Sequence, residues 1–515
     1  MRLHDLLDGV PDAVVCGARR PADGNVAADL VDLDAVVCDS REASHGTLFA
    51  CVPGARHDGH DHAEEAVGRG AAGLLVEREL APLGVPQILV PSVRTALGPI
   101  AAVLAGDPSR AMSVVGVTGT NGKTTVTYLL ASIAQAAGRS ASLLGTLGGR
   151  GPDGEHPDGE HPADATFTTP EAPALQRTLA SFRARGADFL AMEVSSHALH
   201  YRRVDGTRFS AVGFTNLSPE HLDLHGSLAE YFATKARLFS PAFSERAAIV
   251  VDDLWGERLA HEAAERGLEV VTVSGSETRS DVLGVQVRAT EVQLTPVGSR
   301  FLCHTLDNGA FEVATPLLGA FNVTNAVLAI ALAGLAGIAG EAIVRGLEDS
   351  GPVPGRLERV PHRHDFTLLV DYAHTPQALE AVLQTVRGLT PAGRVVIVYG
   401  CGGDRDRTKR AAMGRIAARL ADMAFLTTDN PRSEEPHAIV DDVMRGLTES
   451  DARPVVEPDR RAAIAAAIDA ARPGDVVVIA GKGHETGQTA HGVTVPFDDR
   501  VVAAELLEAR SPRCG

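Results

Sequence analysis

The sequence predicts an α/β protein of three domains, in which a central, mostly parallel sheet carries helices on both faces. Short apolar runs typical of strands alternate with helical patterns along almost the whole chain, which is the pattern of parallel, helix-covered sheets. The chain has 515 residues, and since a domain usually holds roughly 100–200 residues, several cores are expected. A glycine-rich turn between a strand and a helix indicates a central domain of the phosphate-loop type. An N-terminal α/β domain and a Rossmann-like C-terminal α/β domain would flank it.

Two breaks in this pattern divide the chain. Residues 1–110 form the first expected domain, which ends at the loop around Asp107–Pro108. Residues 111–350 form the second, and the Pro/Gly-rich segment Gly351–Gly355 indicates a linker into the third, residues 351–515. The strands expected in these domains are, in chain order, Ala35–Cys38, Leu48–Val52, Gly73–Val76, Ser113–Val117, Asp188–Met192, Ala211–Phe214, Ala247–Val251, Thr367–Val370, Val395–Tyr399, Ala424–Thr427 and Val476–Ala480.

The composition argues for a globular, cytoplasmic protein. A net charge of −18 argues against a broad nucleic-acid-binding face. The longest apolar stretch, Ala326–Gly340, has 15 residues, whereas a membrane-spanning helix needs about 20, so we expect a buried helix there. The N-terminus lacks the features of a signal peptide, and the six cysteines show no CxxC spacing, which is typical of free thiols in a reducing cytosol. We therefore expect a monomer without a nucleic-acid partner and without membrane insertion.

The glycine-rich turn has the sequence Gly116-Val-Thr-Gly-Thr-Asn-Gly-Lys-Thr-Thr125. Glycines let backbone N–H groups surround phosphate oxygens, and the start of the following helix adds a positive dipole. Lys123 would reach the β- and γ-phosphates of ATP, and the Thr124 hydroxyl would hold Mg²⁺. The residues expected around the nucleotide are Gly119, Thr120, Asn121, Gly122, Lys123, Thr124 and Thr125.

The GTNGKTT form of this loop resembles the loop of Mur ligases and folylpolyglutamate synthetases. Members of these families transfer the γ-phosphate of ATP to a substrate carboxylate, and an amine then attacks the acyl phosphate to give an amide. Three further segments resemble the Mur ligase centre closely and in order: EVSSH from Glu193, FTNLSPEHLDLHG around His221, and YFATKARLF around Lys235.

The resemblance implies a reaction centre with two Mg²⁺ ions. Glu193 and His221 would bind the second ion, and Lys235 would be carbamylated to supply an anionic ligand. Without the resemblance, these two residues would not indicate a metal site, because Glu at a strand end is usually solvated and Lys235 would be interpreted as a surface lysine. By resemblance, Asn322 in GAFNVTN lies near adenine, Arg356 reaches the γ-phosphate and Asp371 contacts the ribose. The catalytic residues would be Lys123, Glu193, His221, Lys235 and Arg356.

For the carboxylate substrate, the resemblance is to the branch of the family that adds the third residue of the muramoyl peptide. The segment CDSREASHGTLFACVPG is similar to the uridine-binding segment of that branch. The resemblance implies that UDP-muramoyl-dipeptide is bound by Cys38, Ser40, Thr168, Thr169, Ser195, Tyr201 and Arg203.

The expected amino-acid pocket is the most informative about the second substrate. CGGDRD, DNPR and GKGHE resemble the motifs of family members that add meso-diaminopimelate. The distal carboxylate of that amino acid suits the planar guanidinium of Arg432, and lysine, which lacks this carboxylate, would leave Arg432 without a partner. Glu485 would pair with the distal ammonium, and Arg405 with another carboxylate. The pocket would comprise Arg405, Asp429, Asn430, Pro431, Arg432, Gly481 and Glu485.

Several positions depart from the usual form of the family, and they keep alternatives open. Tyr201 replaces a glutamine that contacts the muramoyl group, and Glu220 replaces an aspartate before the metal-site histidine. The sequence therefore predicts an ATP- and Mg²⁺-dependent ligase of meso-diaminopimelate and UDP-muramoyl-dipeptide. One alternative is a paralogue that uses another carboxylate acceptor in a specialised pathway. The others are a folylpolyglutamate-type ligase and a nucleotide-binding protein without turnover. The remaining departures are Gln377, Ala411 and Gly487.

Overall fold

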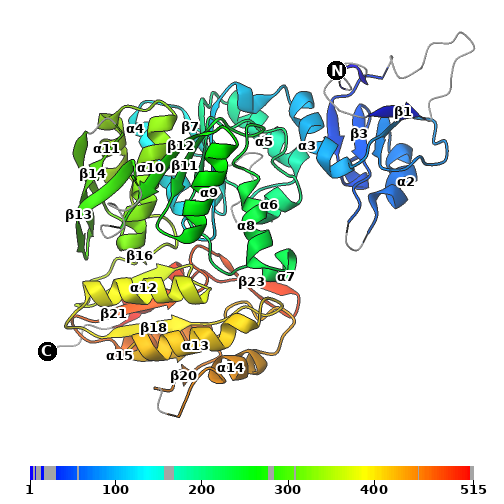
Figure 1. The fold of residues 1–515 in the computed structure, drawn as a ribbon. Coiled ribbons are helices and arrows are strands. Elements are labelled where there is room, and N and C mark those ends of the chain that lie inside the picture. Colours follow the sequence, from blue (N-terminus) through cyan, green and yellow to red (C-terminus); the bar gives the residue numbers. More distant parts are fainter. Residues whose placement is uncertain are drawn as a thin grey trace, which may run out of the picture.

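The computed structural model describes residues 1–3, 6, 13–16, 31–54, 57–155, 167–276, 284–306, 309–449 and 452–510. In this part of the chain, three α/β domains follow one another, each around its own sheet (Figure 1). The predicted fold class is therefore confirmed. None of the described helices is long and apolar enough to cross a membrane.

The N-terminal domain is built on the strand order β1-β5-β4-β3-β2, in which only β1 runs antiparallel to its neighbour. Side chains alternate between the two faces of each strand: Leu48 faces the helix α3, whereas Phe49 faces α2. The elements are β1 (Val14–Cys16), β2 (Ala35–Val37), η2 (Ser40–Glu42), β3 (Thr47–Ala50), η3 (Gly59–His62), α2 (Ala63–Gly68), β4 (Gly73–Val76), β5 (Gln87–Leu89), α3 (Val93–Leu104) and η4 (Pro108–Arg110).

The central sheet has the order β15-β14-β13-β12-β11-β10-β6-β9-β7-β8 in the described chain. Its middle is parallel, and antiparallel pairs close both edges. The strands are β6 (Ser113–Thr118), β7 (Ala141–Gly145), β8 (Gly148–Arg150), β9 (Phe189–Glu193), β10 (Ala211–Phe214), β11 (Arg246–Val250), β12 (Glu269–Ser274), β13 (Val287–Thr295), β14 (Gly298–His304) and β15 (Ala310–Thr315).

Helices cover both faces of this sheet, so its middle strands are buried on both sides and read as apolar runs. One face carries α4 (Lys123–Ala136), α10 (Ala320–Leu335) and α11 (Gly340–Glu348). The other carries α5 (Ala172–Ala184), α6 (Ser196–His200), α8 (Leu228–Ala236) and α9 (Leu254–Glu265), with the short α7 (Leu222–His225) beside α8. The apolar stretch from Ala326 lies in α10, which is buried on nearly all sides, as predicted.

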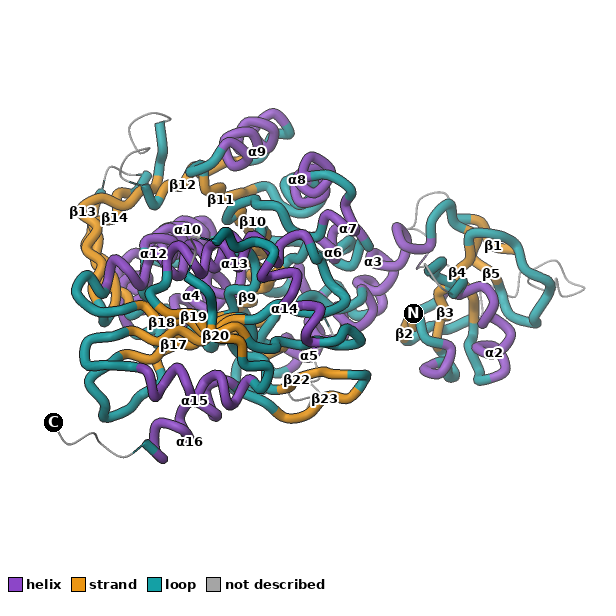
Figure 2. The backbone as a smooth tube through the Cα atoms, turned by 90° about the horizontal axis from the view of Figure 1, so that it is seen from below, coloured by secondary structure: helices purple, strands orange, loops and turns teal. Residues whose placement is uncertain are grey.

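The C-terminal domain has the strand order β16-β17-β21-β18-β19-β20, parallel except at β16. Figure 2 shows its strands between α12–α14 on one side and α15 and α16 on the other. The elements are β16 (Glu358–Arg359), β17 (Thr367–Asp371), α12 (Pro376–Leu389), β18 (Val395–Tyr399), α13 (Thr408–Leu420), β19 (Met423–Leu426), α14 (Pro436–Met444), β20 (Val455–Val456), α15 (Arg460–Ala470), β21 (Val476–Ala480), the hairpin β22 (Gly487–Ala490) and β23 (Val493–Pro496), and α16 (Asp499–Ala509).

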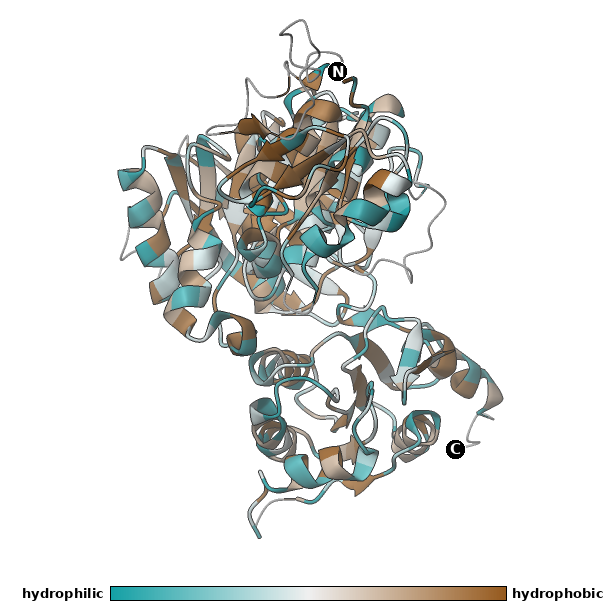
Figure 3. Cartoon of the chain, turned by 90° about the vertical axis from the view of Figure 1, so that its right-hand side faces the viewer, coloured by the Kyte–Doolittle hydropathy of each residue, from teal (hydrophilic) through white to brown (hydrophobic). Residues whose placement is uncertain are grey.

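Hydropathy follows this layering, because the strands inside each sheet are mainly hydrophobic and the outer helices turn polar residues to solvent (Figure 3). Four expected strands, Gly73–Val76, Ala211–Phe214, Val395–Tyr399 and Val476–Ala480, have the observed bounds, and the other seven differ by one or two residues. In the described part of the chain the cysteines Cys16, Cys38, Cys51, Cys303 and Cys401 are free thiols, and Cys514 lies outside that part.

Several contacts set the C-terminal domain against the central one, two of them at its β16 and α12. Gly319, at the start of α10, meets the side chain of Thr385 on α12 so closely that a Cβ at Gly319 would lie 2.6 Å from its methyl group. Arg359 Nη2 donates to the Pro296 carbonyl at 3.2 Å. The N-terminal domain stands to one side and joins the central domain through α3 (Figures 1 and 2).

The two outer helices of the C-terminal domain share a fully buried ion pair between Arg460 on α15 and Asp499 on α16, at 2.6 Å. We expect Asp499→Ala to lower the free energy of unfolding by about 3–5 kcal/mol, because it leaves a guanidinium buried without its counter-charge. Chemical denaturation would measure this. Glu505→Ala, on the same helix, removes the exposed partner of Arg461 and should change that free energy by no more than about 0.5 kcal/mol. Equal losses in the two variants would contradict the prediction.

Candidate active site

The predicted phosphate loop connects β6 to α4 at the carboxyl edge of the central sheet. Gly119 has φ +145°, and a side chain there would overlap Oγ1 of Thr215. Gly122, with φ +88°, precedes the first residue of α4, Lys123. Lys123 Nζ donates to the carbonyl oxygens of Gly119 at 2.9 Å and Thr120 at 2.7 Å. The loop therefore curls around its own lysine, while Thr124 and Thr125 form the buried first turn of the helix.

The neighbouring strand β10 supports this loop, because parallel neighbours end at the same edge of a sheet. The N–H of Thr120 donates to the Asn216 carbonyl, and the N–H of Asn121 donates to Asn216 Oδ1 at 3.1 Å. Thr215 Oγ1 in turn donates to the Asn121 carbonyl at 2.6 Å. Sequence reasoning did not single out Thr215 and Asn216, although both lie in the FTNLS segment.

Lys235 lies beneath the phosphate loop, at the end of α8. Its side chain is buried, with 1% of the residue exposed, and Nζ donates to the Gly119 carbonyl at 2.8 Å and lies 4.6 Å from the Tyr231 ring centroid. Burial, and secondarily the charge of Lys123, hold the pKa of the Lys235 amine well below its usual value. The interpretation of Lys235 as a surface lysine is therefore wrong: this amine is desolvated and faces the phosphate loop.

Glu193 is the last residue of β9 and is also 1% exposed, so its interpretation as a solvated strand end is wrong as well. The backbone N–H and the hydroxyl of Thr146 donate to its two carboxylate oxygens, at 2.8 and 3.0 Å. A Cβ at Gly145 would overlap Glu193 Oε1, so a glycine is needed for the carboxylate to lie there. Burial lowers the pKa of Lys123, and the charges of Glu220 and Glu193 act against this.

His221 and Glu220 stand at the boundary between the central and C-terminal domains. His221 has a left-handed backbone, φ +55°, and its side chain is 42% exposed. The Glu220 carboxylate lies 3.7 Å from His221 Nε2 and 3.6 Å from Nε2 of His374, on the C-terminal domain. Burial opposes ionisation of Glu220, but the hydrogen bond from His374 and nearby positive charge hold its pKa well below the usual value. The unusual Glu220 therefore links the two domains.

The donors predicted for Mg²⁺ come from four elements around the loop. The described residues contain no cluster of three His, Cys, Asp or Glu side chains with the spacing of a metal cage. Mg²⁺ usually takes only one or two carboxylates and completes its shell with water and substrate phosphates, so a preformed cage is not required. The buried carboxylate of Glu193, the imidazole of His221 and the Thr124 hydroxyl are suited to such an open site, whereas the Lys235 amine would supply an oxygen ligand only as a carbamate.

Arg356 crosses from the interdomain linker to the phosphate loop, where Nη2 donates to Thr124 Oγ1 at 3.1 Å. Its guanidinium lies over the Tyr372 ring, 4.6 Å from the centroid. The Asp371 carboxylate accepts from the N–H groups of Leu357 and Ala373, both at 2.7 Å. Asp371 thus fixes the turn that carries Arg356, and its contact with a ribose stays a prediction.

The start of α10 reaches the phosphate loop from the other side. Asn325 Nδ2 donates to Asn322 Oδ1 at 3.0 Å, and a Cβ at Gly122 would overlap Asn325 Oδ1. The amide of Asn322 also donates to the Leu318 carbonyl at 2.9 Å. Asn322 therefore lies one side chain away from the phosphate loop, and its contact with adenine stays a prediction.

The residues predicted for the muramoyl peptide form a connected group behind Glu193. Thr169 Oγ1 donates to the Glu193 carbonyl at 3.0 Å and accepts from the Ser195 N–H at 3.2 Å. Thr168 Oγ1 lies 3.4 Å from Oγ1 of Thr146, the residue that binds Glu193. Arg203 Nη1 donates to the Thr169 carbonyl at 3.1 Å. These side chains lead from the reaction centre toward the N-terminal domain.

Tyr201 lies where that path meets the N-terminal domain. Two guanidinium groups lie over its ring. That of Arg203 is 5.6 Å from the ring centroid, and that of Arg94, in the first turn of α3, is 5.0 Å from it. Burial raises the pKa of the nearby Cys38 thiol to about 12, and Glu171, which pairs with Arg203, contributes. Ser40 is buried and its hydroxyl donates to Glu65 at 2.8 Å. Arg94, which sequence reasoning missed, therefore faces the predicted acceptor path.

The predicted amino-acid pocket holds a buried lysine that sequence reasoning also missed. Lys482 Nζ donates to Asn430 Oδ1 at 3.2 Å, to Glu485 Oε2 at 2.9 Å and to the Gly487 carbonyl at 2.6 Å. Asn430 Nδ2 donates to the same oxygen of Glu485 at 2.9 Å. The Asn430 amide and the Glu485 carboxylate are therefore held in fixed orientations, and both bonds to Glu485 reach Oε2.

The remaining pocket residues surround this group. Arg432 is half-buried, with φ +53°, and Nη1 donates to the Gly403 carbonyl at 2.7 Å. A Cβ at Gly481 would lie 2.5 Å from Oδ2 of the buried Asp429. Pro431 is buried, whereas Arg405 is exposed in the loop after β18. The side chain of Arg405 lies next to the others, since a Cβ at Gly402 would be 3.0 Å from Arg432 Nη1 and 3.8 Å from Arg405 Cγ. The structure thus brings the predicted pocket residues together.

Comparisons with family models, protein sequences and solved structures all match this chain to Mur ligases. Models of the Mur ligase catalytic domain, middle domain and glutamate ligase domain match residues 32–103, 117–333 and 355–483. A UDP-N-acetylmuramoyl-L-alanyl-D-glutamate–2,6-diaminopimelate ligase from Geobacillus thermodenitrificans is 41% identical over 99% of this chain and 100% of its own. A solved structure of a ligase with that name has a TM-score of 0.66 at 32% identity, covering 93% and 95% of the two chains.

A more distant structure shows the fold alone. MurF ligase from Thermotoga maritima in complex with ADP has a TM-score of 0.61 at 18% identity, and the match covers 93% of this chain and 98% of that one.

The geometry of the phosphate loop predicts which glycine is essential. Gly119→Ala should abolish ATP binding, measured by calorimetry, because the methyl group overlaps Thr215 and forces the loop away from β10. Gly138→Ala is the matched control: Gly138 also has positive φ, +76°, but a Cβ there meets no atom within 4 Å. It should lose about 1–2 kcal/mol of stability from its left-handed backbone and keep its affinity for ATP. A Gly119→Ala protein with unchanged ATP affinity would contradict this reading of the loop.

Proposed function

The chain belongs to the Mur ligase family, and on that premise we propose that it joins meso-diaminopimelate to UDP-N-acetylmuramoyl-L-alanyl-D-glutamate at the expense of ATP. The observation that carries this proposal is a pocket that contains the half-buried Arg432 and a Glu485 carboxylate oriented by Lys482 and Asn430. A guanidinium and a carboxylate in one pocket complement the distal carboxylate and ammonium of diaminopimelate. Peptidoglycan precursor synthesis is the process served.

The reaction proceeds in two steps. An oxygen of the D-glutamyl γ-carboxylate attacks the γ-phosphorus of ATP, the bond to the bridging oxygen breaks, and ADP leaves. The amine of diaminopimelate then attacks the carbonyl carbon of the acyl phosphate. Phosphate leaves, the nitrogen loses a proton, and an amide remains.

The reaction centre supplies mainly positive charge and position, which are the main requirements of phosphoryl transfer. Lys123 and Arg356 approach the transferred phosphate from the central domain and the linker. Mg²⁺, when bound by Thr124, Glu193, His221 and Lys235, would neutralise charge on the phosphates. The contacts of Arg356 and Glu220 across the domain boundary hold the C-terminal domain against the phosphate loop and exclude water there.

Each domain then has one task. Residues 1–110 bind the uridine nucleotide through Cys38 and Ser40, and residues 111–350 bind ATP, with Asn322 near adenine. Residues 351–515 bind the amino acid through Asp429, Asn430, Pro431, Arg432, Gly481 and Glu485, with Arg405 at the mouth of the pocket and Asp371 toward the ribose. Thr168, Thr169, Ser195, Tyr201 and Arg203 hold the muramoyl peptide between the first two domains.

In the amino-acid pocket, the position of Glu485 supports one assignment for the ammonium group. Lys482 and Asn430 both bond Oε2, so Oε1 is the oxygen that we assign to the distal ammonium of diaminopimelate. Arg432 takes the distal carboxylate. L-Lysine would leave the guanidinium of Arg432 unpaired, and a site built for hydrogen bonding rejects such a substrate strongly.

The test is phosphate release from ATP by the purified protein with Mg²⁺ and UDP-N-acetylmuramoyl-L-alanyl-D-glutamate. We expect release with meso-diaminopimelate and not with L-lysine. Arg432→Lys keeps the charge but loses the planar fork, so KM for diaminopimelate should rise about 10- to 100-fold. Arg415→Lys, at an exposed position on α13, is the matched control and should leave KM unchanged.

Each outcome separates the candidate functions. Equal rates with lysine would contradict the assigned amine. If folded protein that binds ATP releases no phosphate with either amine, the assigned acceptor is contradicted. That result would indicate a paralogue with another carboxylate acceptor, with Tyr201 as the altered residue. Phosphate release that depends on a folate would indicate a folylpolyglutamate-type ligase, and failure with every acceptor would indicate a nucleotide-binding protein without turnover.

Carbamylation of Lys235 is the second part of the proposal. A lysine attacks CO2 only as the neutral amine, which is a small fraction of an ordinary lysine near neutral pH. Burial lowers the pKa of Lys235, and Nζ is directed at the phosphate loop. The amine nitrogen bonds the carbon of CO2, a proton leaves, and the product carbamate supplies the anionic oxygen that Mg²⁺ prefers.

Native mass spectrometry should find the mass of one CO2 on the wild-type protein and not on Lys235→Ala. Activity of the wild type should fall when bicarbonate is removed. Lys235→Arg, which keeps a positive charge but forms no carbamate, should be inactive, whereas acetate should partly restore Lys235→Ala by supplying a carboxylate. Full activity of Lys235→Arg in ATP-binding protein would contradict the carbamate.

A further inference from the structure

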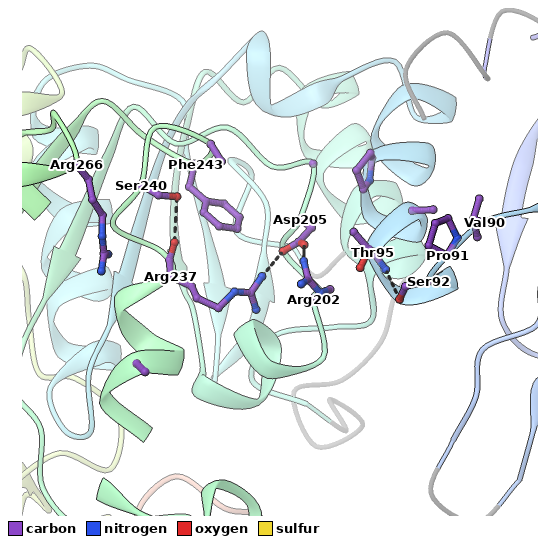
Figure 4. A pocket seen from close by; sticks show the side chains of 15 residues that line it. Val90, Pro91, Ser92, Thr95, Arg202, Asp205, Arg237, Ser240, Phe243 and Arg266 are labelled. Carbon is purple, nitrogen blue, oxygen red and sulfur yellow. Dashed lines mark hydrogen bonds and ion pairs between the residues drawn. The ribbon is translucent and has the colours of Figure 1, made fainter. Parts of the chain in front are cut away.

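A cavity of about 720 Å³ opens where the N-terminal domain joins the central one, and none of the residues assigned above lines it (Figure 4). Its walls are the first turns of α3, the turn 202–206, the end of α8 with the following segment 240–243, and Arg266 after α9. The cavity is large enough for a ligand of the size of a mononucleotide or a small aromatic acid.

The charge of this cavity is opposite to that of the protein. Arg202, Arg237 and Arg266 line it with one lining carboxylate, Asp205, and Arg266 also pairs with Glu262 at 2.8 Å. Asp205 is shared by two of them, Arg202 at 3.0 Å and Arg237 at 3.5 Å. Figure 4 shows Arg237 and Arg202 converging on Asp205 from two sides, with Arg266 farther along the wall. In a chain with a net charge of −18, a lining with an excess of guanidinium groups favours an anion.

The rest of the lining is apolar. The buried ring of Phe243 and the side chains of Pro91, Pro99, Ala233 and Ala242 face the same space. Ligand sites usually combine such apolar walls with a few polar groups that orient the ligand. The combination here fits an anion attached to a flat apolar group, such as an aryl carboxylate, sulfonate or phosphate, in which guanidiniums take the charge and Phe243 and the prolines take the ring.

The cavity is adjacent to the predicted acceptor path through two of its own walls. A Cβ at Gly98 of α3 would overlap the Asp205 carbonyl, and one at Gly206 would lie 2.7 Å from the Gly98 carbonyl. The helix and the 202–206 turn are thus in tight backbone contact. The same helix carries Arg94, and the residues just before the turn include Tyr201, whose ring lies against Arg94. A ligand in the cavity touches both elements that set the position of Tyr201.

We propose that this cavity is a second binding site, for an anion that carries an aromatic group, and that its occupancy changes acceptor affinity through α3 and the 202–206 turn. The binding itself is independent of the proposed function, and only the coupling rests on it. A ligand that binds preferentially to one arrangement of the two domains changes the protein's affinity for the acceptor. The acceptor then changes the protein's affinity for the ligand by the same factor.

The first test uses the aromatic sulfonate 8-anilinonaphthalene-1-sulfonate as the probe, titrated by fluorescence into the full-length protein with saturating ATP and UDP present. Saturable binding is expected. Thr95 lines the cavity, is exposed, and is the third residue after the helix cap Ser92. Thr95→Glu places a negative charge in the cavity and also completes a capping box, so the fold should be kept. It should weaken the probe about tenfold or more.

Thr95→Gln is the matched control, because glutamine has the shape of glutamate without its charge, and this variant should bind the probe like the wild type. Absence of saturable binding, or equal binding to the Glu and Gln variants, would overturn the site. Probe binding that is seen in a parallel titration without UDP and is lost when UDP is present would also overturn it, because the cavity would then belong to the acceptor site.

The second test measures the coupling by calorimetry. The probe should change the Kd of UDP-N-acetylmuramoyl-L-alanyl-D-glutamate, and the acceptor should change the Kd of the probe by the same factor. Thr95→Glu should abolish both changes at a probe concentration that saturates only the wild type. An unchanged acceptor Kd with the probe bound would reject the coupling. Failure of the acceptor to bind at all would contradict the proposed function and leave the first test intact.

Discussion

Two amines converge on one carbonyl oxygen, that of Gly119, and the rest of the reaction centre is arranged around this contact. Nζ of Lys123 lies 2.9 Å from it and Nζ of Lys235 lies 2.8 Å from it. Burial lowers the pKa of each amine, and the charge of Lys123 lowers the pKa of Lys235 further. Glu193 and Glu220 offset part of this charge, and phosphate oxygens would offset the remainder. The loop is therefore suited to anions, and Arg356 adds a further positive charge from the linker.

The distribution of lysine in the chain follows the same chemistry. The sequence has four lysines, and all its other permanent cations are arginines. Lys123 and Lys235 flank the Gly119 carbonyl, Lys482 holds Glu485, and Lys409 donates to the His374 carbonyl at 2.8 Å. An amine can lose its proton or fit as a compact point charge into a buried site, whereas a guanidinium stays charged and needs a planar partner. Lysine occurs in this chain only where those properties are used or where the amine lies beside the domain boundary.

The sequence was sufficient for features that depend on local residues, and insufficient for those that depend on distant ones. The strands and the phosphate loop follow from apolar runs and from glycines that need positive φ, so their positions were predicted closely. Burial of Lys235 and Glu193 depends on Gly119 and Thr146, which are remote in sequence, so without the family resemblance both residues would be interpreted as solvated. Lys482 lay within a recognised motif, but its role appears only when Asn430, 52 residues away, is seen beside it.

The two substrate sites differ in how they are built. The amino-acid pocket lies within one domain, and three hydrogen bonds from a single buried lysine fix its polar groups. The acceptor path instead crosses from the N-terminal to the central domain, and at Tyr201 it is held by ring–guanidinium contacts with Arg94 and Arg203 at 5.0 and 5.6 Å. Such contacts contribute about 0.5–1 kcal/mol when exposed and about 2 kcal/mol when desolvated. On the proposed assignment, selection of the amine would depend on one domain, whereas selection of the acceptor would depend on how two domains meet. That junction is also where the positively charged cavity opens, so a ligand bound there would act on the more adjustable of the two sites.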